Sequence, residues 1–412
     1  MITKKERKLE YIEKGKDSFV DKRGKIENYK LSEKVNLVAT ISSKPNTMRS
    51  NHYHPIQQQK CLLVNGQYIS VYKDLKNKNS LKITQVVNKG DLVITEPLVA
   101  HTMVFLKDSL FLNLVNGERE HKNYGKTHTI PIKLVSEQER DFLFYNYKLN
   151  CRVCEKASLK RLISLGFQPL ANNLIKSKKE QKTFPLELNL CESCKNVQLS
   201  IIPNFKNLFS KYLYKSSVSK SFSKHFEIAA SNYINQLKLK KNTSFIIDIG
   251  SNDGVGLIPF KNRGFKNLLG IEPASNLAKE SRKKGIKTLN DFLTLKSSTK
   301  ISKKADLILA SNVFAHADNL KEMTECMLDL LNKDGTIIIE VQYLMDTMKD
   351  LTFDNIYHEH YNYWSLTSLI NFFNQFNTTI YKAEKIRTHG GSIRIYVKKG
   401  KKNKIDKSIE TF

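Results

Sequence analysis

Hydrophobic residues in the first third of the chain recur in short runs that are typical of β-strands. Each run is rich in β-branched residues and ends at a turn such as Asn65-Gly66, and no helical period interrupts the series. Regular short strands joined by tight turns predict an antiparallel β-barrel or jelly roll. The expected strands cover residues 35–41, 60–64, 67–72, 81–87, 91–95, 103–105 and 110–115.

The pattern changes in the second half of the chain, where helical and strand-like segments alternate. Apolar residues at helical spacing predict a helix over residues 223–239, and apolar runs follow at 246–249, 267–273, 305–310 and 335–341. This alternation predicts a doubly wound, Rossmann-like α/β sheet that binds its ligand at the carboxyl edge of the strands.

The length of 412 residues exceeds what one hydrophobic core supports, so we expect several domains. The predicted fold class is multidomain: an all-β barrel, a small metal-binding module and an α/β domain. The expected boundaries are a β-barrel over 1–136, a charged helical linker over 137–150, a cysteine module over 151–205, an α/β domain over 206–400 and a basic tail over 401–412.

The net charge of +28 indicates an acidic partner, but lysine is spread over nearly every segment. Nucleic-acid binding requires a concentrated basic stripe with stacking aromatic residues, which the sequence lacks. We therefore do not expect a nucleic-acid partner, and steering of a small anionic substrate is the alternative. Residues 1–16 are charged throughout and no run approaches a membrane span, so we expect a cytoplasmic protein without a membrane partner.

Four of the six cysteines form two C-x-x-C pairs. In a chain without a secretory signal, paired C-x-x-C is typical of metal binding rather than of disulfides. Each pair offers two thiolates from a tight turn, and two such turns complete a tetrahedral site that is closed to water. We therefore predict a structural zinc ion held by Cys151, Cys154, Cys191 and Cys194.

A glycine turn follows the apolar run at 246–249. Such a turn is typical of the place where a buried parallel strand leads into a helix at a nucleotide-binding edge. The spacing is not G-x-G-x-x-G, and Asp248 lies within the end of the strand. This favours S-adenosylmethionine over a dinucleotide, because the donor is cationic and has no pyrophosphate. An ordinary glycine turn is the alternative. The candidate ligand-binding residues here are Asp248, Gly250, Ser251, Asn252, Asp253 and Gly254.

Polar residues at the ends of the following strands extend this predicted cofactor site. Glu272 ends the second strand, where a carboxylate can accept both ribose hydroxyls of a nucleoside. Asp291 and Phe292 end the third unit and could hold adenine. Asn312 and His316 follow the fourth strand at the same predicted edge.

A polar cluster at residues 356–364 contains Tyr357-His358-Glu359-His360. Its histidines are two residues apart, which excludes the H-E-x-x-H arrangement of zinc proteases. A histidine oriented by a neighbouring acid can instead remove a proton next to a carbonyl group, while tyrosines stabilise the enolate oxygen. A polar helix cap is the alternative.

The turn into the last strand contains His389, Gly390 and Gly391, and Arg394 follows within that strand. Glycines let backbone N–H groups approach an anion, and the arginine could contact a diphosphate. These residues are candidates for substrate binding, and a simple β-hairpin turn is the alternative.

Histidines also gather in the predicted barrel. His52 and His54 share a strand face, and Gln59 and His101 come from neighbouring strands. The two motifs resemble those of the cupin superfamily, although Gln59 stands where metal-binding cupins usually have Glu. Residues 48–53 also resemble the segment around the catalytic histidine of deoxysugar 3,5-epimerases and related sugar-nucleotide cupins. The cluster is therefore predicted to hold a second divalent metal or to place His52 as a base, with ordinary interior histidines as the alternative.

The four cysteines, the phrase at 165–172 and the phrase at 212–219 resemble sugar C-methyltransferases that carry an N-terminal zinc domain. The resemblance runs from Cys151 to about Lys399. It implies a class I methyltransferase that uses S-adenosylmethionine on nucleotide-linked 4-keto deoxysugars. Members of this family continue with a second Rossmann-like domain, and we expect that domain to be absent or encoded elsewhere because this chain ends at Phe412.

The same resemblance implies roles for individual residues. By position, His360 is the general base, Glu359 its orienting partner and Tyr357 a substrate contact. Tyr214 is the acid or hydrogen-bond donor, with Tyr212 as the alternative.

The leading hypothesis is a cupin fused to a C-methyltransferase that modifies a nucleotide-linked keto sugar through an enolate. The cupin could epimerise the carbon beside the same ketone, and by analogy with other cupins it could form a homodimer. Two other classes compete with this hypothesis: a zinc-containing methyltransferase of RNA or of small-molecule oxygen or nitrogen atoms, and a non-catalytic module that only binds sugar nucleotides.

Overall fold

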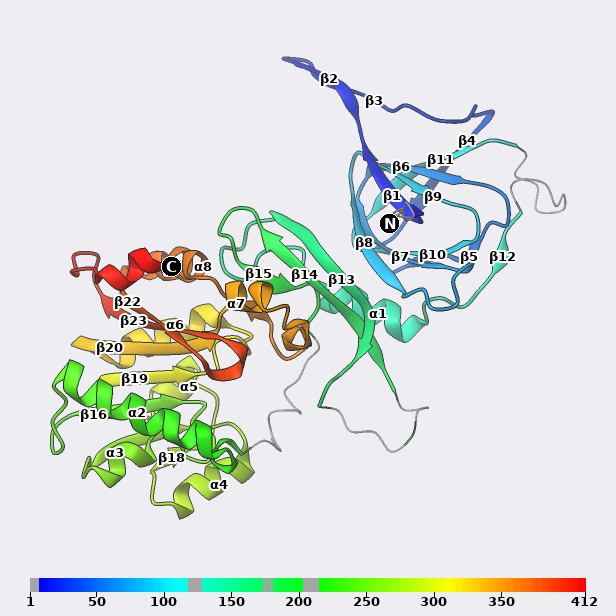
Figure 1. Ribbon diagram of the computed structural model, residues 1–412. Helices are drawn as coiled ribbons and strands as arrows, with labels where there is room; N and C mark the ends of the chain where they lie inside the picture. The colour runs from blue at the N-terminus through cyan, green and yellow to red at the C-terminus, as the bar shows by residue number, and fades with distance from the viewer. Residues whose placement is uncertain (1–6, 118–127, 173–176, 178–180, 203–214) are drawn as a thin grey trace. The chain divides into compact units, whose positions relative to one another are not determined.

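The computed structural model describes residues 7–117, 128–172, 177, 181–202 and 215–412 (Figure 1). The chain packs as two units, one formed by residues 1–147 with 163–187 and the other by 148–162 with 188–412. No helix in the described ranges is both long enough and apolar enough to cross a lipid bilayer.

The first unit contains two five-stranded antiparallel sheets. In spatial order, the first sheet is β1 (Glu10–Lys14), β9 (Asp91–Thr95), β6 (Gln59–Asn65), β11 (Ser109–Val115) and β4 (Leu37–Ser43). The second is β12 (Ile130–Pro131), β5 (Met48–Tyr53), β10 (Val99–Phe105), β7 (Gln67–Asp74) and β8 (Ile83–Asn88). A separate hairpin consists of β2 (Lys16–Asp21) and β3 (Gly24–Asn28).

Side chains from both sheets form one core, in which Leu63, Phe105 and Phe111 are buried. The short β-branched runs bounded by turns therefore predicted most of these strands. One strand differs from the prediction, because β10 begins at Val99 rather than at 103 and so includes His101. The sequence analysis did not predict β1 or the β2–β3 hairpin, which are rich in charged residues.

Helix α1 (Glu137–Asn146) begins at a capping box. The Ser136 hydroxyl accepts from the Glu139 backbone N–H, and the Glu139 carboxylate accepts from the Ser136 N–H. A four-stranded sheet follows, ordered β13 (Leu159–Pro169), β14 (Thr183–Cys191), β15 (Val197–Leu199) and β21 (Asn362–Tyr363). The last strand comes from a segment far along the chain, and it brings residues 362–363 next to 197–198.

The second unit contains a seven-stranded sheet, as the alternation of strands and helices predicted. Its order is β18 (Thr288–Leu289), β17 (Asn267–Ile271), β16 (Phe245–Ile249), β19 (Ala305–Ser311), β20 (Leu331–Gln342), β23 (Ser392–Lys399) and β22 (Thr378–Ile386). The strands from β18 to β20 are parallel, and β23 is antiparallel to both of its neighbours. The order reverses between β16 and β19, which is where ligands bind in open α/β sheets.

Helices cover both faces of this sheet (Figure 1). Apolar side chains of α2 (Lys220–Leu237) and α3 (Ile258–Asn262) pack on one face, and those of α6 (Leu320–Leu330) and α8 (Leu366–Phe373) pack on the other. The remaining helical segments are α4 (Ser275–Lys283), α5 (Leu295–Ser298), α7 (Leu344–Lys349), η2 (Ser216–Val218), η3 (Phe353–Asn355), η4 (Asn374–Phe376), η5 (Thr388–Gly390) and η6 (Lys407–Thr411).

The α6–α8 face contains an aromatic cluster. Phe314 is fully buried, and its ring centroid lies 5.6 Å from those of Trp364 and Phe372 and 5.9 Å from that of Phe373. Because Phe314 follows β19 and Trp364 follows β21, the cluster fixes the strand edge against the segment at 356–364.

Replacement of Phe314 by Ala should therefore lower the free energy of unfolding of the second unit by about 3–5 kcal/mol, because it removes a fully buried ring and leaves a cavity. Urea denaturation followed by the fluorescence of Trp364, the only tryptophan, measures this effect. Phe353, which is 70% exposed, provides the matched control, and F353A should change the free energy by less than about 0.5 kcal/mol. Equal losses in the two variants would contradict the prediction.

Candidate functional site

The four predicted zinc ligands converge in the second unit. Their sulfur atoms all lie within 4.8 Å of one another, with Sγ–Sγ distances of 3.4 Å for Cys151–Cys194 and 3.5 Å for Cys154–Cys191. A tetrahedral zinc ion with bonds of about 2.3 Å separates its sulfur ligands by about 3.8 Å. The four thiols therefore fit a zinc ion.

Each C-x-x-C pair forms a knuckle that directs backbone N–H groups at sulfur. The Val153 N–H donates to Cys151 Sγ, and the Cys194 N–H donates to Cys191 Sγ, both at 3.4 Å. The hydrogen bond with Cys194 lowers the pKa of the Cys151 thiol. Three of the cysteines belong to the same hydrophobic core as the α6–α8 face of the sheet, so the metal site packs against this sheet.

The glycine turn leaves β16 as predicted. Gly250 has a φ of +64°, and a Cβ there would lie 2.4 Å from the Val313 side chain. Only glycine combines this backbone conformation with such a close approach. The N–H groups of Gly250 and Ser251 both donate to the Ile271 carbonyl oxygen, which joins the turn to the end of β17.

Two acidic side chains lie at these adjacent strand ends. Asp248 is 5% exposed, and burial together with repulsion from Glu272 raises its pKa to about 8. Burial also raises the pKa of Glu272, while the N–H groups of Ala274 and Asn252, each at 2.8 Å, act in the other direction. Neither carboxyl contacts a basic side chain in the described residues. This pair suits a cationic ligand with a ribose diol and does not suit a pyrophosphate.

Other predicted cofactor residues support the turn. Asp253 is buried and pairs with Lys284 at 2.7 Å, and Asp291 pairs with Lys300 at 3.0 Å. Phe292 is 45% exposed beside β18. Each of these two aspartates therefore already has a lysine as its ion-pair partner.

The remaining turn residues hold the backbone of the strand edge. Ser251 is buried and lies against Gly270, and Gly254 has a φ of +85°. Asn252 and Asn312 both have positive φ, and the Asn312 N–H donates to the Glu340 carbonyl oxygen at 2.7 Å.

The segment at 356–364 holds a histidine in one tautomer. Nδ1 of His360 lies 3.0 Å from the carbonyl oxygen of Asn355, which can only accept, so Nδ1 carries the proton. Nε2 therefore has the lone pair, and it accepts from the Tyr357 hydroxyl at 3.1 Å. The geometry makes Nε2 of His360 a base beside a phenol. The sequence analysis missed Asn355, because no motif marks a backbone carbonyl.

This segment and the cofactor edge are joined directly. Nδ1 of His316, which follows β19, donates to the Glu359 carbonyl oxygen at 2.7 Å, and the Tyr361 N–H donates to the Ala315 carbonyl oxygen at 2.8 Å. The rings of His316 and His360 lie 4.9 Å apart. The Glu359 side chain is 4% exposed. The structure thus brings together a predicted cofactor residue and the predicted base.

The predicted substrate-binding turn splits into two parts. Residues 388–391 form η5 and the following bend, with φ of +74° at Gly390 and +111° at Gly391, and the backbone of His389 lies within η5. Arg394 is only 4% exposed and pairs with Glu340 at 2.8 Å and Glu384 at 3.2 Å. Its guanidinium is committed to two carboxylates inside the sheet, so we do not retain it as a diphosphate contact. Tyr212 and Tyr214 lie outside the described residues.

The barrel histidines form a second cluster, in the first unit. His52 on β5 pairs in register with His101 on β10, and a bulge follows between His101 and Thr102. Ring centroids lie 4.8 Å apart for His52–His101 and 4.9 Å apart for His52–His54. The three offer nitrogen atoms within 4.8 Å of one another.

The protonation of this cluster follows from its contacts. Nδ1 of His101 donates to the Val99 carbonyl oxygen at 3.1 Å, so its Nε2 has the lone pair. Burial lowers the pKa of His54 and His101, although the His128 carbonyl and Gln59 act in the opposite direction on His54. Neutral, buried imidazoles with inward lone pairs are the form that metal ions bind.

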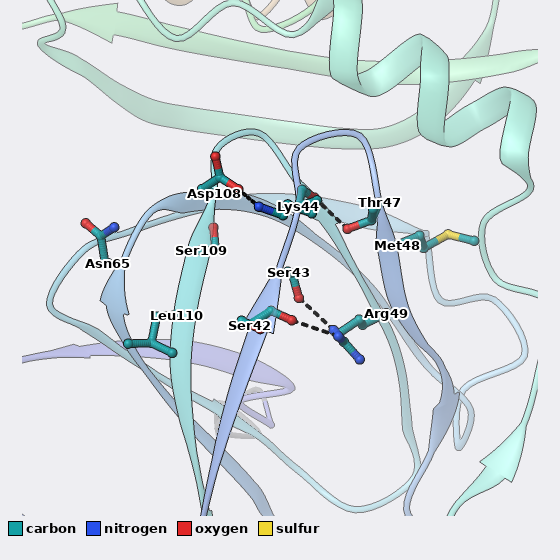
Figure 2. Close-up of a pocket in the computed structure, with 10 residues that line it drawn as sticks. All are labelled: Ser42, Ser43, Lys44, Thr47, Met48, Arg49, Asn65, Asp108, Ser109 and Leu110. Carbon is teal, nitrogen blue, oxygen red and sulfur yellow. Dashed lines mark hydrogen bonds and ion pairs between the residues drawn. The ribbon is translucent and has the colours of Figure 1, made fainter.

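A cavity of about 540 Å³ opens at the other end of β5 (Figure 2). The Arg49 guanidinium donates to Ser43 Oγ at 2.6 Å and to the Ser42 carbonyl oxygen at 2.7 Å, and Lys44 forms an ion pair with Asp108 at 3.4 Å. None of the three histidines of the cluster lines this cavity. The cavity is therefore separate from the histidine cluster, and its basic groups already have partners.

Comparison with known families matches two parts of the second unit. Residues 151–209 match a model described as "Putative zinc binding domain", and residues 223–383 match a model described as "Methyltransferase domain". The first match begins at Cys151 and contains all four cysteines. The second contains the glycine turn, Glu272 and the segment at 356–364.

Among curated proteins, the chain is similar to the C-methyltransferase NovU of Streptomyces niveus, with 29% identity over 252 residues. The match covers 60% of this chain, and it spans 60% of the relative's length.

Two solved structures are also similar. The plantazolicin methyltransferase BpumL in complex with SAH is 17% identical, and the match covers 43% of this chain and 82% of that one at a TM-score of 0.35. The QdtA 3,4-ketoisomerase of Thermoanaerobacterium thermosaccharolyticum in complex with TDP is 21% identical, with 29% and 86% covered at a TM-score of 0.25. These low scores add no weight to the fold.

The strand order, the glycine turn, the four-cysteine cluster and the two family matches agree with one another. The chain thus contains a methyltransferase domain and a zinc-binding domain, and S-adenosylmethionine and zinc are the cofactors of these two parts.

Proposed function

We propose that the chain methylates a carbon atom next to the carbonyl group of a nucleotide-linked keto deoxysugar. The observation that carries this proposal is the tautomer of His360. Its Nδ1 donates to the Asn355 carbonyl oxygen, which leaves Nε2 as the base. The His360 ring lies beside that of His316, which follows β19 at the predicted cofactor edge and donates to the Glu359 carbonyl oxygen. The similarity to a C-methyltransferase supports carbon as the acceptor. A carbon acceptor must first lose a proton from carbon, whereas transfer to an oxygen or nitrogen atom does not require removal of a proton from carbon.

The donor site is proposed at the ends of β16 and β17. Asp248 faces the positive end of the donor, and Glu272 accepts from the ribose hydroxyls, since each of its oxygens has a second lone pair beside its backbone N–H contact. Phe292, which is 45% exposed beside the third strand, offers a face for adenine. When bound, S-adenosylmethionine supplies an electrophilic methyl group to a nucleophilic carbon.

The chain's own residues make that carbon nucleophilic. Nε2 of His360 removes the proton from the carbon next to the ketone, and the C–H electron pair moves into the enolate. The proton stays on the imidazole, whose Nδ1–H is held by Asn355, so the ring keeps its orientation as it becomes positive. The hydroxyl of Tyr357, 3.1 Å from Nε2, is placed to donate to the enolate oxygen. Glu359, the preceding residue in the chain, is buried and is proposed as the orienting partner of this histidine.

A tyrosine and a glycine turn also belong to this proposal. Tyr214, or alternatively Tyr212, serves as the second hydrogen-bond donor to the substrate. The turn of His389, Gly390 and Gly391 is proposed to contact the substrate, because glycines with φ of +74° and +111° let a ligand approach the backbone closely.

We propose a second function for the first unit, as a cupin with a divalent metal held by His52, His54 and His101. The specific observation is that Nε2 of His54 and Nε2 of His101 are buried without a hydrogen-bond partner in the described residues. Gln59 lies on β6 of the other sheet, and its side chain interacts with His54 of this cluster. A metal ion would satisfy those atoms. A homodimer formed through this unit also remains a proposal.

Replacement of His360 by Asn should lower kcat for carbon methylation by about 10²–10⁴-fold, because it removes the base and retains a similar shape. Binding of the methyl donor, measured by calorimetry, should stay within twofold of the original. The assay uses a methyl-labelled donor and a panel of nucleotide-linked keto sugars, with the label located by NMR. Methylation of oxygen or nitrogen only, or an active His360→Asn variant, would contradict the proposal.

The raised pKa of Asp248 predicts that donor binding depends on pH. In the ligand-free protein this carboxyl is largely protonated at pH 7, because its pKa is about 8. A cationic ligand favours the carboxylate, so binding releases a proton, and affinity should rise with pH and level off above about pH 8.

Calorimetry at pH 7 in two buffers of different ionisation enthalpy measures this proton release. The Asp248→Asn variant should bind more weakly and without the pH dependence, while Glu272→Gln should keep a pH dependence that is shifted to lower pH, because the repulsion that helps to raise the pKa of Asp248 is lost. Identical binding enthalpies in both buffers for the unaltered protein would rule out the assigned role of Asp248.

The metal proposal predicts two metal sites per chain. Cobalt-loaded protein should contain two metal ions per chain, one bound by thiolates and one by imidazoles. His101→Ala should lose one metal equivalent, while the charge-transfer absorption of the thiolate site remains. Elemental analysis and visible absorption measure both quantities. An unchanged metal content in His101→Ala would assign the histidines to proton transfer instead.

A further inference from the structure

Arg152 lies between the two cysteines of the first knuckle, yet its side chain extends out of the metal site. Its side chain is 7% exposed. The guanidinium donates to the Ala317 carbonyl oxygen at 3.3 Å, to the Asp318 carbonyl oxygen, and to the Asp318 carboxylate at 3.0 Å. It also lies over the ring of Tyr361, 5.4 Å from the centroid.

These contacts reach both segments that build the candidate active site. Ala317 and Asp318 directly follow His316, and Tyr361 directly follows His360. The two segments are themselves hydrogen-bonded, because the Tyr361 N–H donates to the Ala315 carbonyl oxygen. A single guanidinium thus holds the strand edge and the base-bearing segment in one register.

The second knuckle contacts the same segment from its other side. Nδ2 of Asn196 donates to Oδ1 of Asn362 at 3.1 Å, and Nδ2 of Asn371 donates to the Cys194 carbonyl oxygen at 3.1 Å. Strand β15, which follows this knuckle, pairs with β21 at 362–363. Both knuckles are therefore attached to residues 361–371, although the metal is distant from them in sequence.

We propose that Arg152 is a positioning residue that transmits the geometry of the zinc knuckle to His360. The metal fixes the backbone on both sides of Arg152, so the buried side chain starts from a rigid base. Its terminal Nη2 then donates to two consecutive carbonyl oxygens and to a carboxylate, while the planar guanidinium lies over an aromatic ring, and lysine has no planar group to reproduce this combination. This inference rests on the proposed function, because it takes His360 to be the base.

The test compares Arg152→Met with Arg152→Lys, and Arg263→Met serves as the matched control. Arg263 pairs with Glu227 at 2.6 Å on the opposite, α2–α3 side of the sheet. In Arg152→Met, amide hydrogen exchange at 357–363 should accelerate at least tenfold, exchange at 246–254 should not change, and the fluorescence of Trp364 should shift. Arg152→Lys should restore part of the protection, and Arg263→Met should match the unaltered chain.

Function gives a second measurement. The kcat of Arg152→Met for carbon methylation should fall at least tenfold, while its dissociation constant for the donor stays within twofold of that of the unaltered chain. The variant should still release one zinc ion per chain when a mercurial modifies the cysteines. Unchanged exchange at 357–363 would overturn the proposal. Loss of zinc in both Arg152 variants would also overturn it, because the arginine would then serve the metal site itself. If the unaltered chain methylates no sugar carbon, the proposed function fails, while the exchange measurement still decides the role of Arg152.

Discussion

Cys151, Cys154, Cys191 and Cys194 meet in one site, where all four can be thiolates only if a metal ion compensates their charge. This constraint brings two knuckles together from segments 36 residues apart. The strands that leave the second knuckle then pair with β21, and Arg152 reaches the loop after β19. The candidate active site is therefore built on a metal site that takes no part in its chemistry.

Sequence patterns predicted those features that depend on local periodicity or on short spacing. The strands of both units, the glycine turn and the four cysteines are of this kind, because each is encoded by residues that are close together in the chain. Two results depended on distant partners. The sequence predicted Arg394 as a contact for an anionic substrate. In the structure its guanidinium forms ion pairs with Glu340 and Glu384 of the neighbouring strands. The tautomer of His360 depends on a backbone carbonyl, which has no signature in sequence.

The histidine cluster of the first unit shows the same limit. Period-two spacing placed His52 and His54 on one face, but the path of the chain just before them is irregular. Ser50 and Asn51 have φ of +75° and +57°, and the Asn51 side chain bonds the backbone at 134–135 and the Thr102 hydroxyl. This arrangement turns β5 against β10, so the convergence with His101 follows from a side chain that a strand pattern does not single out.

The buried carboxyl of Asp248 also has a consequence for turnover. Methyl transfer converts a sulfonium donor into a neutral thioether, so the ligand loses its positive charge within the site. A carboxyl whose pKa is about 8 is stable as an anion only beside that charge, and it regains a proton once the charge is gone. With the donor placed as proposed, the charge of the ligand alone would separate donor from spent product at Asp248, and loss of that charge would favour product departure without any change of shape.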